Sequence, residues 1–149
     1  MSDSPTANPA ANPIIKALRK SFKHVSEVVQ CDLADPNRDS DFRLVIRSKT
    51  GQHSMGVDVI SLPTDPYIAE EDVNVPLPLA FSSDKATRFI VLHFQDTKST
   101  QVLPFIGVKA ALETYLPVWR QIFPAGEEIR IPHSVLVSAV NAELELASF

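Results

Sequence analysis

The chain has little of several residue types that mark familiar classes of protein. Its 149 residues include one cysteine, Cys31, which excludes an internal disulfide and a multi-cysteine zinc site. Such cysteine usage is typical of a reducing compartment, so we expect a cytoplasmic protein. Only four glycines are present, and none belongs to a phosphate-cradling loop or a Gly-x-Ser-x-Gly elbow. No segment approaches the roughly 18 uninterrupted apolar residues of a membrane-spanning helix, which predicts a soluble protein.

Charge of either sign is also modest. The formal net charge is -4 and 21% of the residues are charged, too mild an imbalance to predict polyanion binding by the whole molecule. The hydrophobic content of 44% is enough for one packed core. Residues 1–13 contain no basic residue and no apolar run, so they match neither a secretory signal nor a transit peptide. We therefore expect a flexible tail at 1–13 and a single domain at 14–149.

Residues 14–29 predict an amphipathic helix. The apolar residues recur at helical spacing, and they are Ile14, Leu18, Phe22, Val25 and Val29. The other side is basic, with Lys16, Arg19, Lys20 and Lys23. Such a face could bind anions, either nucleic acid or a membrane surface. Because it has no interleaved aromatic residues and no recognition motif, an ordinary solvated helix face is the interpretation we favour.

Two antiparallel hairpins are predicted. Strands at 42–48 and 53–62, joined through a Thr50-Gly51 turn, would set Phe42 opposite Val59 and Arg43 opposite Asp58. Strands at 88–94 and 101–105 would set Phe94 opposite Gln101. Pro104 cannot donate a ladder hydrogen bond, so the last of these strands should lie at a sheet edge, where another copy of the chain could pair.

Residues 63–83 predict a long loop with extended pieces, because this segment contains four prolines. Long loops in compact domains are often functional, so we expect a partner-binding segment here. Its apolar anchors would be Leu77, Leu79 and Phe81. A basic partner would be steered by the adjacent carboxylates of Glu70, Glu71 and Asp72.

The C-terminal third predicts two helices. Residues 107–124 have apolar side chains at helical spacing, but Pro117 removes a backbone donor in the middle, so we expect a kink or two short helices. A short strand is expected at 128–131. A closing helix at 134–147 would have Ser134 as its cap, although Val135 and Val137 also suit a strand.

The sequence gives little support for a catalytic site or a metal site. On a helix, His24 and Cys31 would lie on the order of 10 Å apart along the axis, too far for a catalytic Cys-His pair. His24 and Glu27 would need a further metal ligand from another element. We therefore predict no catalytic residue, no metal and no cofactor, while a site assembled by folding stays open.

The fold class we predict is α+β. It comprises the N-terminal amphipathic helix, an antiparallel sheet of about four or five strands from the two hairpins, and C-terminal helices packed on one face. The function we predict is a non-enzymatic protein-binding, adaptor or chaperone-like module that self-associates as a homodimer, through an exposed sheet edge or the C-terminal helix. One alternative is a small-ligand-binding or catalytic domain with a pocket between the sheet and the kinked helix near Trp119. The other alternative is nucleic-acid or membrane binding through the basic helix face.

Overall fold

The computed structural model describes residues 11–31, 40–82, 87–126 and 128–147. In chain order the elements are α1 (Ala11–Ser21), β1 (Glu27–Gln30), β2 (Phe42–Ser48), β3 (Gly51–Leu62), α2 (Pro66–Ala69), β4 (Asn74–Pro78), the 3-10 turn η1 (Leu79–Ser82), β5 (Thr87–Phe94), β6 (Ser99–Pro104), α3 (Phe105–Ile122), β7 (Glu128–Pro132) and α4 (His133–Ala147). This mixture of helices and strands confirms the α+β class. None of the described helices is both long enough and apolar enough to cross a membrane.

The main sheet has five strands in the order β1-β2-β3-β5-β6. Neighbouring strands are antiparallel, except that β3 and β5 run parallel. The parallel pairing requires a crossover, and residues 63–86 provide it. Within that crossover, β4 pairs with β7 as a separate two-stranded antiparallel sheet. The prediction of a purely antiparallel sheet is therefore wrong at its centre.

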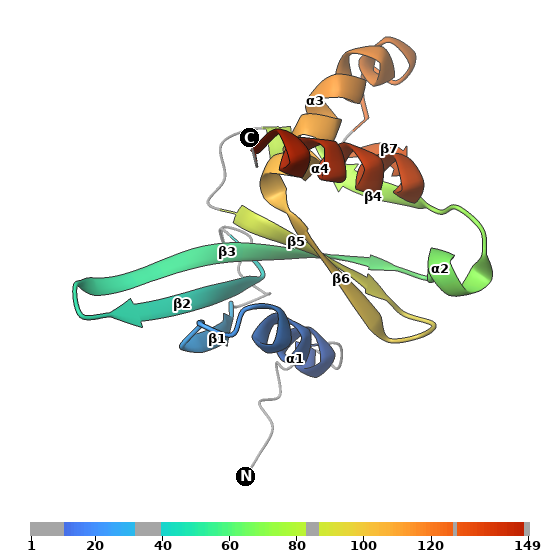
Figure 1. Cartoon of the computed structure of the whole chain (residues 1–149). Helices are drawn as coiled ribbons and strands as arrows, with labels where there is room; N and C mark the ends of the chain where they lie inside the picture. Colours follow the sequence, from blue (N-terminus) through green and yellow to red (C-terminus); the bar gives the residue numbers. More distant parts are fainter. Residues whose placement is uncertain (1–10, 32–39, 83–86, 127, 148–149) are drawn as a thin grey trace.

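Helices cover both faces of the main sheet (Figure 1). The larger apolar core joins β5 and β6 to α3, α4, β4 and β7, and the smaller one lies under α1. Alternate residues of β5 serve the two cores, because Ile90 and Leu92 belong to the larger core and Val91 to the smaller. The C-terminal helices do lie together on one face, as predicted.

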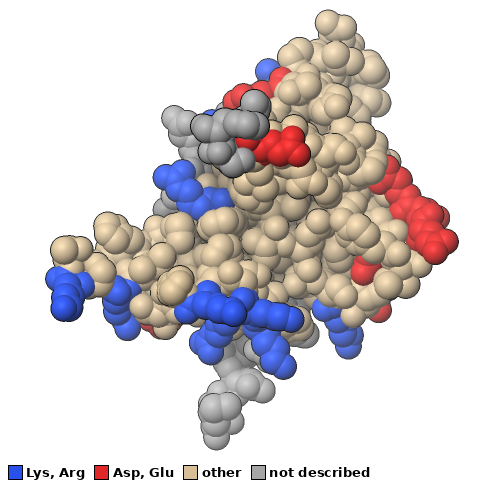
Figure 2. All heavy atoms as spheres, in the orientation of Figure 1, with Lys and Arg blue, Asp and Glu red and all other residues tan. Residues whose placement is uncertain are grey.

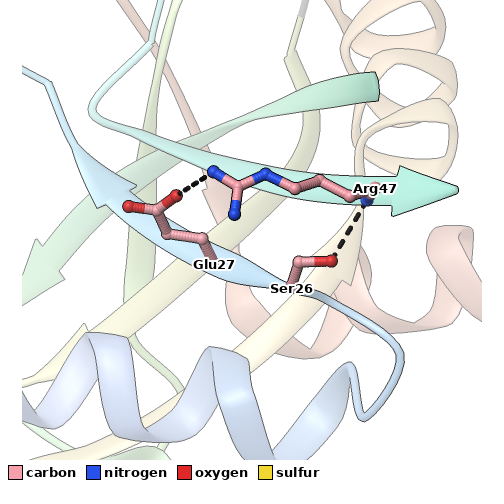
Figure 3. A network of polar contacts seen from close by, with 3 residues as sticks. All are labelled: Ser26, Glu27 and Arg47. Carbon is pink, nitrogen blue, oxygen red and sulfur yellow. Dashed lines mark hydrogen bonds and ion pairs between the residues drawn. The ribbon is translucent and has the colours of Figure 1, made fainter. Parts of the chain in front are cut away.

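The first helix is shorter than predicted. It begins at Ala11, inside the expected tail, and ends at Ser21, while the rest of that tail, residues 1–10, lies outside the described residues. Residues 27–30 form β1 against β2, where Val28 is buried and Val29 is 37% exposed. Figure 3 shows this junction: the backbone N–H of Arg47 donates to Ser26 Oγ, and its guanidinium lies 3.0 Å from Glu27. β-Branched valines favour an extended strand, which explains why the helical spacing of the apolar residues predicted a helix here wrongly.

Both hairpins exist, but each pairs two residues away from the predicted register. Phe42 lies opposite Val57 instead of Val59, across a turn at Lys49-Thr50, and Phe94 lies opposite Ser99 instead of Gln101. Because side chains alternate with a period of two, this shift keeps the predicted apolar faces. It does change the residue directly opposite Arg43 from Asp58 to Gly56. Asp58 accepts a 2.6 Å hydrogen bond from Thr87 Oγ1.

The segment at 63–83 is not a long irregular loop, because α2, β4 and η1 occupy most of its described part. Its prolines are compatible with regular structure. Pro66 begins a helix, where its missing N–H costs nothing, and Pro76 and Pro78 lie on the short strand β4. The proline-containing sequence pattern of this segment therefore predicted extended pieces correctly. It did not indicate their pairing partner, β7, which lies more than 50 residues away.

The segment around Pro117 forms one helix, α3, and not two short ones. Pro117 is exposed, so water can satisfy the carbonyl group that its missing N–H leaves free. The helix α4 also differs from the prediction, because it begins at His133 and its first turn is capped from another segment of the chain.

Candidate functional site

A hollow of about 440 Å³ lies where α2 and the residues after it meet the first turn of α4. We call it the acidic hollow, and it is lined by Pro66, Tyr67, Glu70, Glu71, Asp72, His133, Ser134 and Val137. Three of the predicted partner-binding residues, Glu70, Glu71 and Asp72, which are consecutive in the chain, therefore line the same hollow. Folding adds α4, which the sequence did not indicate as part of the same site.

Asp65 fixes the position of α2. Its Oδ1 accepts a hydrogen bond from the backbone N–H of Tyr67, which makes it the N-cap of this short helix. Its Oδ2 accepts from Thr97 Oγ1 at 3.0 Å, and its own N–H donates to the carboxylate of Asp96. These bonds tie α2 to the β5–β6 turn. After buried Pro66, the side chains of Tyr67 and Ile68 are 62% and 70% exposed.

Asp72 joins the acidic hollow to α4. Its two carboxylate oxygens accept hydrogen bonds from the backbone N–H of Ser134 at 3.1 Å and from Ser134 Oγ at 2.5 Å. The hydrogen bonds from Ser134 lower the pKa of the Asp72 carboxyl below its ordinary value. Ser134 was predicted to cap this helix with its own side chain, but Asp72 provides the cap. The Asp72 carboxylate is thus occupied within the chain.

His133 forms the inner wall of the acidic hollow. It is 4% exposed, and its ring packs edge-on against Tyr67 with centroids 5.3 Å apart. The Nε2 atom lies 2.8 Å from Gln101 Oε1, and the Gln101 amide nitrogen donates to the Tyr67 hydroxyl at 3.3 Å. With Gln101 in this orientation, His133 is the donor. Burial lowers the pKa of His133, partly offset by the carboxylates of Asp72 and Asp65.

Glu70 and Glu71 supply the accessible negative charge of the acidic hollow. Both side chains are exposed, and within the described part of the chain neither forms an ion pair. Glu70 has φ of 54°, the left-handed conformation that ends α2 and turns the chain toward β4. Figure 2 shows acidic side chains gathered on the side of the molecule where Figure 1 places α2. Exposed carboxylates beside exposed Tyr67 and Ile68 can attract a cationic, partly apolar segment.

The predicted apolar anchors lie elsewhere. Leu77 is fully buried on β4 and Phe81 is 4% exposed, so both belong to the larger core. Leu79 is half-buried against the same core. Leu77 and Phe81 are not available to a partner, because Leu77 on β4 and Phe81 on η1 both pack inside the larger core. The exposed apolar side chains near the acidic hollow are instead those of Tyr67 and Ile68. Tyr67, from an unremarkable Pro-Tyr-Ile run, carried no sequence signal.

The basic face lies on α1, which covers the opposite face of the main sheet from α3 and α4. Lys16, Arg19 and Lys20 are exposed on α1, and Lys23 is exposed just after it. A second hollow, of about 320 Å³, is lined in part by Arg19 and Lys23. In Figure 2 basic side chains gather along the lower edge, where Figure 1 places α1 and the β2–β3 hairpin. Anion binding here stays a prediction.

Trp119 lies on α3, where its ring packs on Phe123 with centroids 4.6 Å apart. It also packs against the larger core, whose side chains Leu92, Val108 and Leu112 occupy the space between β5 and α3. The ring nitrogen Nε1 is buried and has no hydrogen-bond partner among the described residues. A ligand pocket near Trp119 stays a prediction.

The sequence-derived candidates for metal and thiol chemistry are not brought together. His24 is exposed between α1 and β1, Glu27 pairs with Arg47, and Cys31 is a half-exposed free thiol. Among the residues that the structure describes, no three His, Cys, Asp or Glu side chains gather as a metal site. No protein-family model, no curated protein and no solved structure matches the chain.

Proposed function

We propose that the protein is a protein-binding module that captures cationic, partly apolar segments of a partner at the acidic hollow. The observation that carries this proposal is the adjacency of exposed Glu70 and Glu71 to Tyr67 and Ile68, which are 62% and 70% exposed. Exposed apolar side chains beside unpaired carboxylates offer a partner both a hydrophobic contact and an electrostatic attraction.

The construction around the acidic hollow supports binding. His133, Gln101 and Tyr67 form a connected set of hydrogen bonds, and Asp72 is held by Ser134. Such bonds keep the walls in place before a partner arrives, which reduces the entropy lost on binding. The half-exposed free thiol of Cys31 agrees with a reducing, cytoplasmic setting, which is part of the same proposal.

A direct test measures binding of synthetic peptides to the full chain by fluorescence anisotropy. One set of peptides is amphipathic with Lys and Arg, and a matched set carries Glu in their place. We expect the cationic set to bind with Kd in the range of about 1 to 100 μM at low salt and more weakly at high salt. Glu71→Lys should weaken binding by about tenfold, because it places like charge against the peptide.

The matched control is Glu113→Lys, an equal change of charge at an exposed position on α3. Ile68→Asp should also weaken binding, whereas Ile106→Asp, at a residue 62% exposed on α3, should not. If cationic and anionic peptides bind alike, or if Glu71→Lys and Glu113→Lys have the same effect, the acidic hollow is not the binding surface.

A further inference from the structure

The apolar stripe of α3 extends beyond the core that covers it. Val108 and Ala111 are 0% and 1% exposed, whereas Tyr115, Val118 and Ile122 are 42%, 61% and 65% exposed. These five residues are spaced by three or four along one helix, so they lie on one face. The face that packs inside the protein at the start of α3 is therefore uncovered at its end. We call the uncovered residues Tyr115, Val118 and Ile122 the α3 stripe.

The shape of the molecule leaves the α3 stripe accessible. In Figure 1 the second half of α3 projects beyond α4 and the two sheets, and Figure 2 shows this projection as a mainly uncharged surface. Phe123, packed on Trp119, is 49% exposed at the same end. A projecting helix with one apolar side can lie along a second helix without a clash between the two bodies.

We propose that the α3 stripe is the contact between two copies of this chain. The projection carries one exposed acid, Glu113, and one exposed base, Arg120, so it has no net charge to select an oppositely charged partner or to repel an identical one. An antiparallel arrangement with its two-fold axis beside Val118 sets Tyr115 of each copy against Ile122 of the other. Such a contact is self-complementary and closes at two subunits.

The exposed area indicates a reversible dimer. The α3 stripe with Phe123 exposes on the order of 400 Å² of apolar surface, the size of the largest apolar patch on a typical monomer, which is often functional. A stable interface buries roughly 800 Å² on each partner. The α3 stripe with Phe123 supplies about half of that area, so we expect a dissociation constant in the range of about 1 to 100 μM.

The experiment is sedimentation velocity of the full chain across a wide range of concentrations. We expect the unmodified protein to pass from monomer to dimer, and Val118→Asp/Ile122→Asp to weaken the dimer at least about tenfold. Both side chains are more than half exposed, so the variant should fold, which its circular dichroism and thermal midpoint check. Ile106→Asp, at an exposed position on the same helix, should leave the dimer unchanged.

Three results would overturn the proposal. The first is a monomer at every concentration, which would assign the α3 stripe to a different occupant. The second is a folded Val118→Asp/Ile122→Asp variant that dimerises like the unmodified protein. The third is equal loss of the dimer in the Ile106→Asp control. Glu71→Lys should not affect the dimer, so this proposal and the peptide-binding proposal fail independently.

Discussion

His133 illustrates how one residue acquires properties from its surroundings. It follows the last residue of β7, begins α4, and is enclosed by Tyr67, Phe94 and Gln101. The hydrogen bond from its backbone N–H to the Val73 carbonyl, at 2.7 Å, holds the start of α4 against the chain just before β4. In the sequence it is an isolated histidine after a proline, and nothing near it in the chain reveals these contacts.

The burial of His133 makes the stability of the protein depend on pH. Its pKa is lowered in the folded protein, so the unfolded chain, with a histidine pKa near about 6.5, binds more protons as the pH falls through that value. The contribution of neutral His133 to the free energy of unfolding is therefore fully present above the pKa that this histidine has in the unfolded chain. It is lost as the pH decreases below that value. We expect urea unfolding to show a fall in stability from about pH 7.5 to about pH 5.5 that is smaller in His133→Gln.

The matched control for His133 is His53→Gln, at an exposed position on β3. It should keep the pH dependence of the unmodified protein. A fall in stability that is identical in all three proteins would assign the dependence to other groups and contradict the expected role of His133.

At the scale of elements, the crossing of α3 and α4 depends on Gly107. A Cβ atom at this position would lie 2.8 Å from the Cα of Val140, closer than real Cβ contacts come. The atom in the way is backbone, so α4 would have to move. Gly107→Ala should lower the free energy of unfolding by about 1 to 3 kcal/mol, even though alanine favours a helix by up to about 1 kcal/mol.

Gly126→Ala is the control for Gly107, since a Cβ there would meet nothing nearer than 3.6 Å. Urea denaturation of the two variants measures the difference. If Gly107→Ala were as stable as Gly126→Ala, the close approach of the two helices would not be required for stability.

Local patterns predicted most elements and failed where pairing is distant in the sequence. The alternation in 42–48 and 88–94 identified strands and their apolar faces, because both are properties of neighbouring residues. The register depends on turn geometry, and in both hairpins each residue of the first strand pairs with a residue two positions earlier than predicted. The pairing of β4 with β7, the parallel pairing of β3 with β5 and the burial of Leu77 require contacts between distant segments, which periodicity does not encode.

The candidate site was predicted only in part, for the same reason. Glu70, Glu71 and Asp72 are consecutive, so their acidic cluster was visible in the sequence. The residues that line the hollow with them come from α2 and α4, and His133 is held by Gln101, 32 residues away in the chain. An apolar side chain in the same segment could be taken for a surface anchor or for core, and Leu77 proved to be core.

At the scale of the whole molecule, charge is separated between two regions. Basic side chains gather around α1 and acidic side chains around α2 (Figure 2), although the formal net charge is only -4. Composition averages over these regions and therefore conceals them. Each region can attract a different kind of partner, and the attraction should weaken as salt screens it.

The basic region gives a prediction of its own. If it binds anions, the unmodified protein should bind DNA or anionic vesicles at low salt, and Lys16→Glu/Lys20→Glu should abolish that binding with little change in thermal midpoint. The control, Lys98→Glu/Arg120→Glu, changes the net charge equally at exposed positions outside α1. The absence of binding by the unmodified protein at low salt would end this hypothesis.

The pairing of β4 with β7 has a consequence for how the chain matures during synthesis. Val75 and Leu77 on β4 are fully buried, and their strand partners are residues 128–132, made more than 50 residues later. Until that segment leaves the ribosome, the crossover between the two parallel strands has an open edge and an uncovered apolar side. A nascent chain that ends before β7 is therefore the form in which this protein is most exposed to aggregation and to chaperones.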